Sequence, residues 1–117
     1  MLQTNLTHVN SEEEFNKMLS ENENVMIWCG RMGPMCIPVY GVMEELEEEY
    51  TNVKFADMAF DSAHSHVIRN LPECSGFQGL PFTVYFKNGK VAKATSSIQN
   101  MEQVTEILDN EFGKVDA

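Results

Sequence analysis

The sequence predicts a single α/β domain with a mixed central β-sheet that is covered by helices on both faces. Three observations lead to this class. Apolar runs are typical of buried strands, amphipathic segments lie between them, and an Asn-Gly pair in the last third of the chain predicts a β-hairpin. The length of 117 residues suits one hydrophobic core, so one domain is expected over residues 1–117.

The first half of the chain alternates strands and helices. A short strand is expected near residues 6–9, and the next helix opens at Ser11, where Glu14 completes a capping-box pattern. Residues 25–29 are all apolar, which is typical of a strand buried on both faces. The helix after this strand has an outer face rich in glutamate. Its apolar face is formed by Tyr40, Met43, Leu46 and Tyr50.

Residues 53–60 form another near-continuous apolar run and predict a second central strand. A weaker helix is expected over residues 63–70. Strands that are joined through helices are most simply parallel, so the early strands are expected to form a parallel part of the sheet.

The last part of the chain predicts a hairpin and a closing helix. Asn88 and Gly89 both tolerate positive φ, so they suit a two-residue turn between strands at residues 82–86 and 91–95. The final helix is expected to begin after Asn100, with Gln103 three residues later. Its apolar stripe contains Met101, Val104, Ile107, Leu108 and Phe112.

Composition excludes several classes of protein. The net charge of −10 argues against binding nucleic acid through its phosphates. No apolar run approaches the roughly 20 residues that cross a bilayer, and the first residues lack the regions of an export signal. Three cysteines form no disulfide framework, so a reducing cytoplasm is the expected compartment. A monomer is the expected state.

The segment from Trp28 to Pro38 is the most informative part of the sequence. It joins a buried strand to an amphipathic helix through the turn Gly33-Pro34-Met35-Cys36. Pro38 suits the first position of the helix, so Cys36 would precede the helix N-terminus, where the helix dipole favours a thiolate. The alternative is a shielded cysteine that is retained because it packs well.

This turn, the segment Gly79-Leu80-Pro81-Phe82 and the hairpin that follows it resemble the thioredoxin family. The resemblance covers nearly the whole chain, from about residue 5 to residue 112. It implies the thioredoxin fold, thiol-disulfide exchange with protein clients or thiol-containing partners, and no cofactor. It also implies a cis proline at Pro81 that faces the active-site cysteine. The client-binding surface would consist of Met32, Gly33, Pro34, Met35, Leu80 and Pro81.

The chain departs from the family pattern at the site itself. Gly33 stands where the nucleophilic cysteine is expected, so the usual two-thiol cycle cannot run at these positions. Met32 replaces a tryptophan, and Trp28 is a candidate to cover part of the site instead. Ile27 takes the position of the family's buried aspartate, and Asp57 stands where its lysine partner would be.

Two functions follow from this pattern. The first is a thiol-disulfide redox protein in which Cys36 forms mixed disulfides with protein clients, as an atypical protein-disulfide oxidoreductase. The alternative is a redox-inactive interaction module that uses the surface of Met32, Met35 and Pro81, because thioether side chains adapt to varied partners.

Asp57 is the second candidate catalytic residue. A carboxylate in an apolar central strand suits acid-base work, so Asp57 could exchange a proton with Cys36 beneath the turn. Alternatively, it points to a sheet end and meets water or Lys54.

The other two cysteines are candidate resolving thiols. Cys74 lies in a loop, and a passive loop cysteine is the alternative for it. Cys29 ends a strand whose burial favours core packing over a disulfide with Cys36. His64 and His66 match no closed zinc pattern with the acids and cysteines nearby, so no metal is expected.

Overall fold

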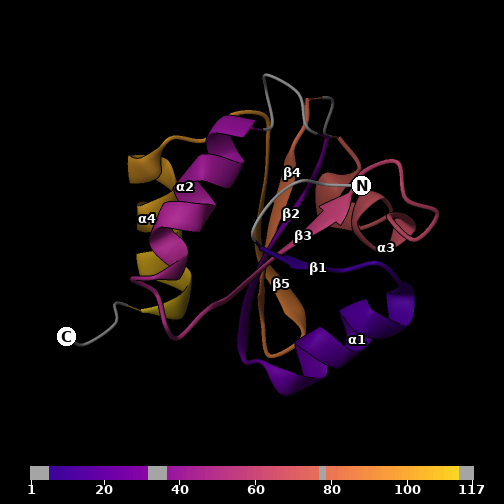
Figure 1. Cartoon of the computed structure of the whole chain (residues 1–117), viewed down its shortest axis with the longest axis horizontal. Coiled ribbons are helices and arrows are strands. Elements are labelled where there is room, and N and C mark those ends of the chain that lie inside the picture. Colours follow the sequence, from indigo (N-terminus) through magenta and orange to yellow (C-terminus); the bar gives the residue numbers. More distant parts are fainter. Residues whose placement is uncertain (1–5, 32–36, 77–78, 114–117) are drawn as a thin grey trace.

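The computed structural model describes residues 6–31, 37–76 and 79–113 (Figure 1). Strands and helices alternate in its first half, and a hairpin and a final helix close its second half, as the sequence predicts. The first elements are β1 (Thr7–His8), α1 (Glu12–Glu21), β2 (Asn24–Gly30), α2 (Ile37–Glu47) and β3 (Lys54–Ala59). The others are α3 (His66–Arg69), the 3₁₀ helix η1 (Pro72–Cys74), β4 (Phe82–Lys87), β5 (Lys90–Ser96) and α4 (Met101–Phe112).

The strands form one mixed sheet in the order β1-β3-β2-β4-β5. β1, β3 and β2 are parallel, as expected for strands joined through helices, whereas β4 and β5 are antiparallel to their neighbours. The long central strand β2 is buried on both faces over residues 25–30. Burial on both faces therefore explains the apolar run of this strand, as the sequence predicts.

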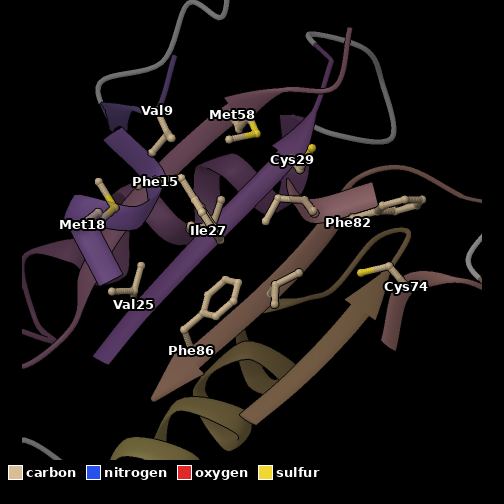
Figure 2. Packing of buried hydrophobic residues seen from close by; sticks show 13 residues of the cluster. Val9, Phe15, Met18, Val25, Ile27, Cys29, Met58, Cys74, Phe82 and Phe86 are labelled. Carbon is tan, nitrogen blue, oxygen red and sulfur yellow. The ribbon is translucent and has the colours of Figure 1, made fainter. Parts of the chain in front are cut away.

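Each face of the sheet carries its own hydrophobic cluster. The first cluster joins the sheet to α2 and α4, which lie side by side in Figure 1. It includes Trp28, Met43, Phe55, Tyr85 and Leu108. The second cluster lies under α1 and α3 on the opposite face (Figure 2). It includes Phe15, Ile27, Cys29, Cys74 and Phe86.

Local signals set several element ends. Asn88 and Gly89 have φ of 54° and 80°, which is the positive φ that the two-residue hairpin turn requires. Asn100 and Gln103 form a complete capping box at α4. At α1 only half of the expected box forms, because the Ser11 hydroxyl accepts from the Glu14 N–H but also donates to the Glu14 carboxylate at 3.5 Å.

Two helices are shorter than predicted. α2 ends at Glu47, so Tyr50 lies beyond it and donates its hydroxyl to Asp109 of α4 at 2.7 Å. Consecutive glutamates at the C-terminal end of a helix oppose its dipole, which explains the early end. α3 has four residues instead of the predicted eight, because the Ser65 hydroxyl bonds to carbonyls of the preceding turns, including that of Phe60 at 2.7 Å.

Candidate functional site

One end of the sheet gathers the segments on which the candidate site depends. In the register of the sheet, Cys29 of β2 pairs with Phe82 of β4, and Phe82 pairs with Ser96 of β5. The end of β2, the start of β4 and the end of β5 therefore lie together, and α2 begins at the same end (Figure 1). The candidates Met32, Gly33, Pro34, Met35 and Cys36 lie outside the described residues.

The segment before β4 has the backbone geometry that the resemblance implies. The Leu80–Pro81 peptide bond is cis, Pro81 is buried and Leu80 is half-buried. The Ser97 N–H lies 3.2 Å from the Gly79 carbonyl oxygen and 3.1 Å from that of Pro81, which ties this segment to the end of β5. A Cβ at Gly79 would lie 3.3 Å from Ser97 Cβ, so glycine permits this close approach.

Two large hydrophobic side chains are exposed in the described part of the chain. Ile37 at the start of α2 is 45% exposed, and Ile98 between β5 and α4 is 44% exposed. Both lie on segments that reach the end of the sheet described above (Figure 1).

Asp57 is completely buried, and its partner was not foreseen. The Asp57 carboxylate lies 2.7 Å from Nδ1 of His8, whose side chain is 29% exposed. The expectation that Asp57 meets water or Lys54 did not include this histidine. Successive strand residues alternate between faces, so Lys54 and Asp57 project from opposite faces of β3.

Asp57 lies in a polar row that crosses the sheet. His8, Asp57, Trp28, Thr83 and Thr95 are successive register partners on five strands. Trp28 is completely buried in the first cluster, with its ring 6.4 Å from that of Tyr40, and the turn that it is expected to cover in part lies outside the described residues. Thr83 is also completely buried, and its hydroxyl has no hydrogen-bond partner among the described residues. The face toward α2 and α4 thus carries the first hydrophobic cluster and, within it, this row of register partners with its polar groups.

Ile27 and Asp57 take the positions of the family's buried aspartate and of its lysine partner, but they project from opposite faces of the sheet. Ile27 packs in the second cluster, and its register partner on β3 is Ala56. Asp57 is instead the register partner of Trp28, on the opposite face.

Both candidate resolving thiols are inside the protein. Cys29 is 0% exposed and Cys74 is 2% exposed, and both belong to the second cluster (Figure 2). Burial, with a contribution from Glu73, raises the pKa of the Cys74 thiol to about 11. The expected burial of Cys29 is confirmed, and Cys74 is a packed cysteine rather than a loop thiol open to solvent.

The described residues contain no group of three or more metal-ligating side chains. His66 lies 3.4 Å from a carboxylate oxygen of Glu12 instead. Within the same ranges, no helix has the length and apolar character needed to cross a bilayer.

Sequence reasoning missed His8, Arg31 and Arg69. His8 reaches Asp57 across 49 residues of sequence, which no local pattern reveals. The two arginines are the only ones in the chain, and both lie against Phe60. Their rarity in an acidic sequence is the one signal that could have drawn attention to them.

Among known proteins, this chain is similar to solved structures, whereas neither family models nor curated proteins match it significantly. A thioredoxin structure from Plasmodium falciparum has a TM-score of 0.74 at 22% identity, over 90% of this chain and 98% of that one. Thioredoxin from Trypanosoma brucei brucei has 0.73 at 23%, over 93% and 92%. A mutant thioredoxin from Halobacterium salinarum has 0.77 at 19%, over 94% and 93%. The element order, the mixed sheet and these similarities show that the chain has the thioredoxin fold.

Proposed function

We propose that this chain is a thiol-disulfide redox protein that acts on protein clients through Cys36 alone. The observation that carries the proposal is the meeting of three segments at one end of the sheet. These are the end of β2, the start of α2 and the cis Leu80–Pro81 segment. Cys36 directly precedes the first residue of α2, where the helix dipole favours a thiolate.

The burial of the other cysteines supports a single-thiol reaction. A resolving thiol must reach the mixed disulfide as a thiolate, and its rate depends on access and on the pKa of the thiol. Cys29 is completely buried, and the pKa of Cys74 is raised to about 11. Neither suits this role, so the resolver is a thiol of the client or of a separate molecule.

The chemistry then has two balanced steps. The Cys36 thiolate attacks one sulfur of a client disulfide, forms a mixed disulfide and releases the other client sulfur as a thiolate. A second thiolate, from the client or an external thiol, attacks the client sulfur of the mixed disulfide. That attack forms the new disulfide and releases the Cys36 thiolate. Where the external thiol is a dithiol, its second thiolate attacks its own sulfur in the new disulfide, which releases the reduced client thiolate and oxidises the dithiol.

Asp57 is proposed to exchange a proton with Cys36. Its neighbours Phe55 and Ala59 on the same face of β3 belong to or pack on the first cluster, which also contains Val39 of α2. The carboxylate therefore lies on the side of the sheet that α2 covers. His8 would connect this buried acid to solvent, because its ring is hydrogen-bonded to Asp57 and partly exposed.

Client binding is proposed at the surface of Met32, Gly33, Pro34, Met35, Leu80 and Pro81. The exposed side chains of Ile37 and Ile98 support this assignment, because Ile37 follows the turn directly in sequence and Ile98 follows Ser97, which bonds to the Gly79 and Pro81 carbonyls. The same surface would serve a redox-inactive interaction module, which is the alternative function.

Insulin-disulfide reduction with dithiothreitol separates the two functions. For a redox protein, wild type accelerates the reaction, Cys36→Ser falls to the uncatalysed rate, and the matched variant Cys74→Ser keeps the wild-type rate. Equal background rates for wild type and Cys36→Ser would favour the interaction module. Capture of client disulfides on Cys36 from cell extract then identifies the clients of a redox protein.

A further inference from the structure

The two arginines of this acidic chain are brought to one aromatic ring. Arg31 follows β2, and Arg69 ends α3. Their guanidinium carbons lie 5.2 and 5.3 Å from the centre of the Phe60 ring. These are cation-π distances, and a ring that contacts two guanidinium groups restrains both. A chain with net charge −10 thus brings its two guanidinium groups together at one place, which we call the Arg31–Arg69 surface.

The surrounding structure orders the Arg69 side chain and the backbone that leads to Arg31. The Ser65 hydroxyl is completely buried, bonds to the Phe60 carbonyl and accepts a 2.8 Å hydrogen bond from Nε of Arg69. The Phe60 N–H in turn donates to the Gly30 carbonyl at 2.9 Å, which aligns the residue before Arg31. Side chains that are ordered before binding lose less entropy when a ligand arrives.

Arg31 already holds a carboxylate of the chain itself. Its Nε and Nη2 donate to the two oxygens of Asp61 at 2.8 and 2.7 Å, in the bidentate geometry that guanidinium and carboxylate prefer. The hydrogen bond from Arg31, reinforced by the charges of both arginines, lowers the pKa of Asp61. Both partners are more than half exposed, so this pair contributes little stability and exchanges readily.

Arg69 offers the second half of the surface. Its side chain is exposed, and its two terminal nitrogens make no hydrogen bond to the described residues. Because Nε is already engaged by Ser65, the terminal edge is the part that can bind a second carboxylate in a bidentate manner.

From this arrangement we infer that the Arg31–Arg69 surface binds an acidic segment of a partner protein. One carboxylate of the segment binds the terminal edge of Arg69, and another replaces Asp61 on Arg31. The occupant is identified by charge complementarity, since these are the only guanidinium groups of the chain. The inference goes beyond the proposed redox function, because binding at this surface involves no thiol.

Fluorescence anisotropy with a fluorescein-labelled hexaglutamate peptide tests the inference. The high negative charge of the protein repels this probe in general, so measurable binding requires a local site. Arg69→Gln is expected to weaken binding by about tenfold, as for the loss of charge-assisted hydrogen bonds. Arg69→Lys keeps the charge but not the planar fork, and it should recover only part of the affinity. Lys93→Gln removes an exposed cation from β5 and should change little.

Asp61→Asn is expected to change the affinity for the peptide in the direction opposite to that of Arg69→Gln. Removal of the internal carboxylate should strengthen peptide binding several-fold, whereas Glu106→Gln, a matched loss of charge on α4, should not. Four results would overturn the inference. These are equal effects of Arg69→Gln and Lys93→Gln, equal effects of Asp61→Asn and Glu106→Gln, equal binding of a hexaglutamine peptide, or displacement of the probe by inorganic phosphate more readily than by unlabelled hexaglutamate. Each of them would leave the insulin-reduction test of Cys36 unaffected.

Discussion

Nδ1 of His8 lies 2.7 Å from Oδ1 of Asp57, and this pair joins the edge strand β1 to the central strand β3. β1 has two residues and two register pairs with β3, so its backbone ladder is short. The Asp57 carboxylate is 1% exposed, whereas the His8 side chain is 29% exposed. A hydrogen bond to a buried carboxylate therefore reinforces the weakest edge of the sheet.

Replacement of His8 by Ala is expected to lower the free energy of unfolding by about 1–3 kcal/mol, because a buried carboxylate loses a hydrogen-bond partner. His64→Ala, a change of the same kind at an exposed position, should cost less than about 0.5 kcal/mol. Urea unfolding at neutral pH measures both values. Indistinguishable midpoints for the two variants would show that the His8–Asp57 pair adds no stability.

The fold was largely predictable, because its signals are local. The apolar run at Val25–Cys29, the Asn88-Gly89 turn and the Asn100 cap each act within a few residues, and the structure confirms all three. The His8–Asp57 pair was not predictable in this way, because two strands must first align in register before the side chains meet. The same holds for Arg31 and Arg69, which converge on Phe60 only in the folded chain.

Cys74 should make stability depend on pH in the alkaline range. Burial raises the pKa of its thiol from 9.0 to about 11. Between these values the unfolded chain loses the thiol proton while the folded protein keeps it, so the free energy of unfolding falls as the pH rises. The stability difference between wild type and Cys74→Ala should be constant below about pH 9 and should narrow by up to about 2 kcal/mol toward pH 11.

Urea unfolding of both proteins at several pH values measures this difference. Groups other than Cys74 titrate alike in the two proteins, so their effects cancel. A difference that stays constant up to pH 11 would mean that the Cys74 thiol titrates as it does in the unfolded chain.

Gly79→Ala should strain the connection between the Leu80–Pro81 segment and β5. The new methyl group would lie 3.3 Å from Ser97 Cβ, which is tighter than an ordinary contact. We expect a loss of about 1 kcal/mol or more in the free energy of unfolding. Gly76→Ala is the matched control, because a Cβ there meets nothing within 4 Å. If both variants unfold at the same urea concentration, Ser97 accommodates the methyl group without cost.

The backbone geometry of the Leu80–Pro81 segment was predictable, whereas the surroundings of the cysteines were not. The Gly79-Leu80-Pro81 motif led to the segment that the structure ties to Ser97, since a short motif can mark a backbone geometry. The exposure of a thiol depends on what packs around it, which sequence does not reveal. Cys74 illustrates this, because a cysteine in a Pro- and Gly-rich stretch proved to be 2% exposed.

The last prediction concerns the thiol that Gly33 removes from the turn. Gly33→Cys gives a Cys-Pro-Met-Cys sequence that ends at Cys36, and we expect insulin reduction faster than that of wild type. The gain should be partial, because Pro34 biases the residue before it toward extended conformations and differs in position from the proline of a thioredoxin turn. Cys36→Ser in the Gly33→Cys background should remove the gain, since two thiols are then no longer present. A folded Gly33→Cys protein with no gain would mean that the scaffold has lost redox competence, and the interaction module would become the better assignment.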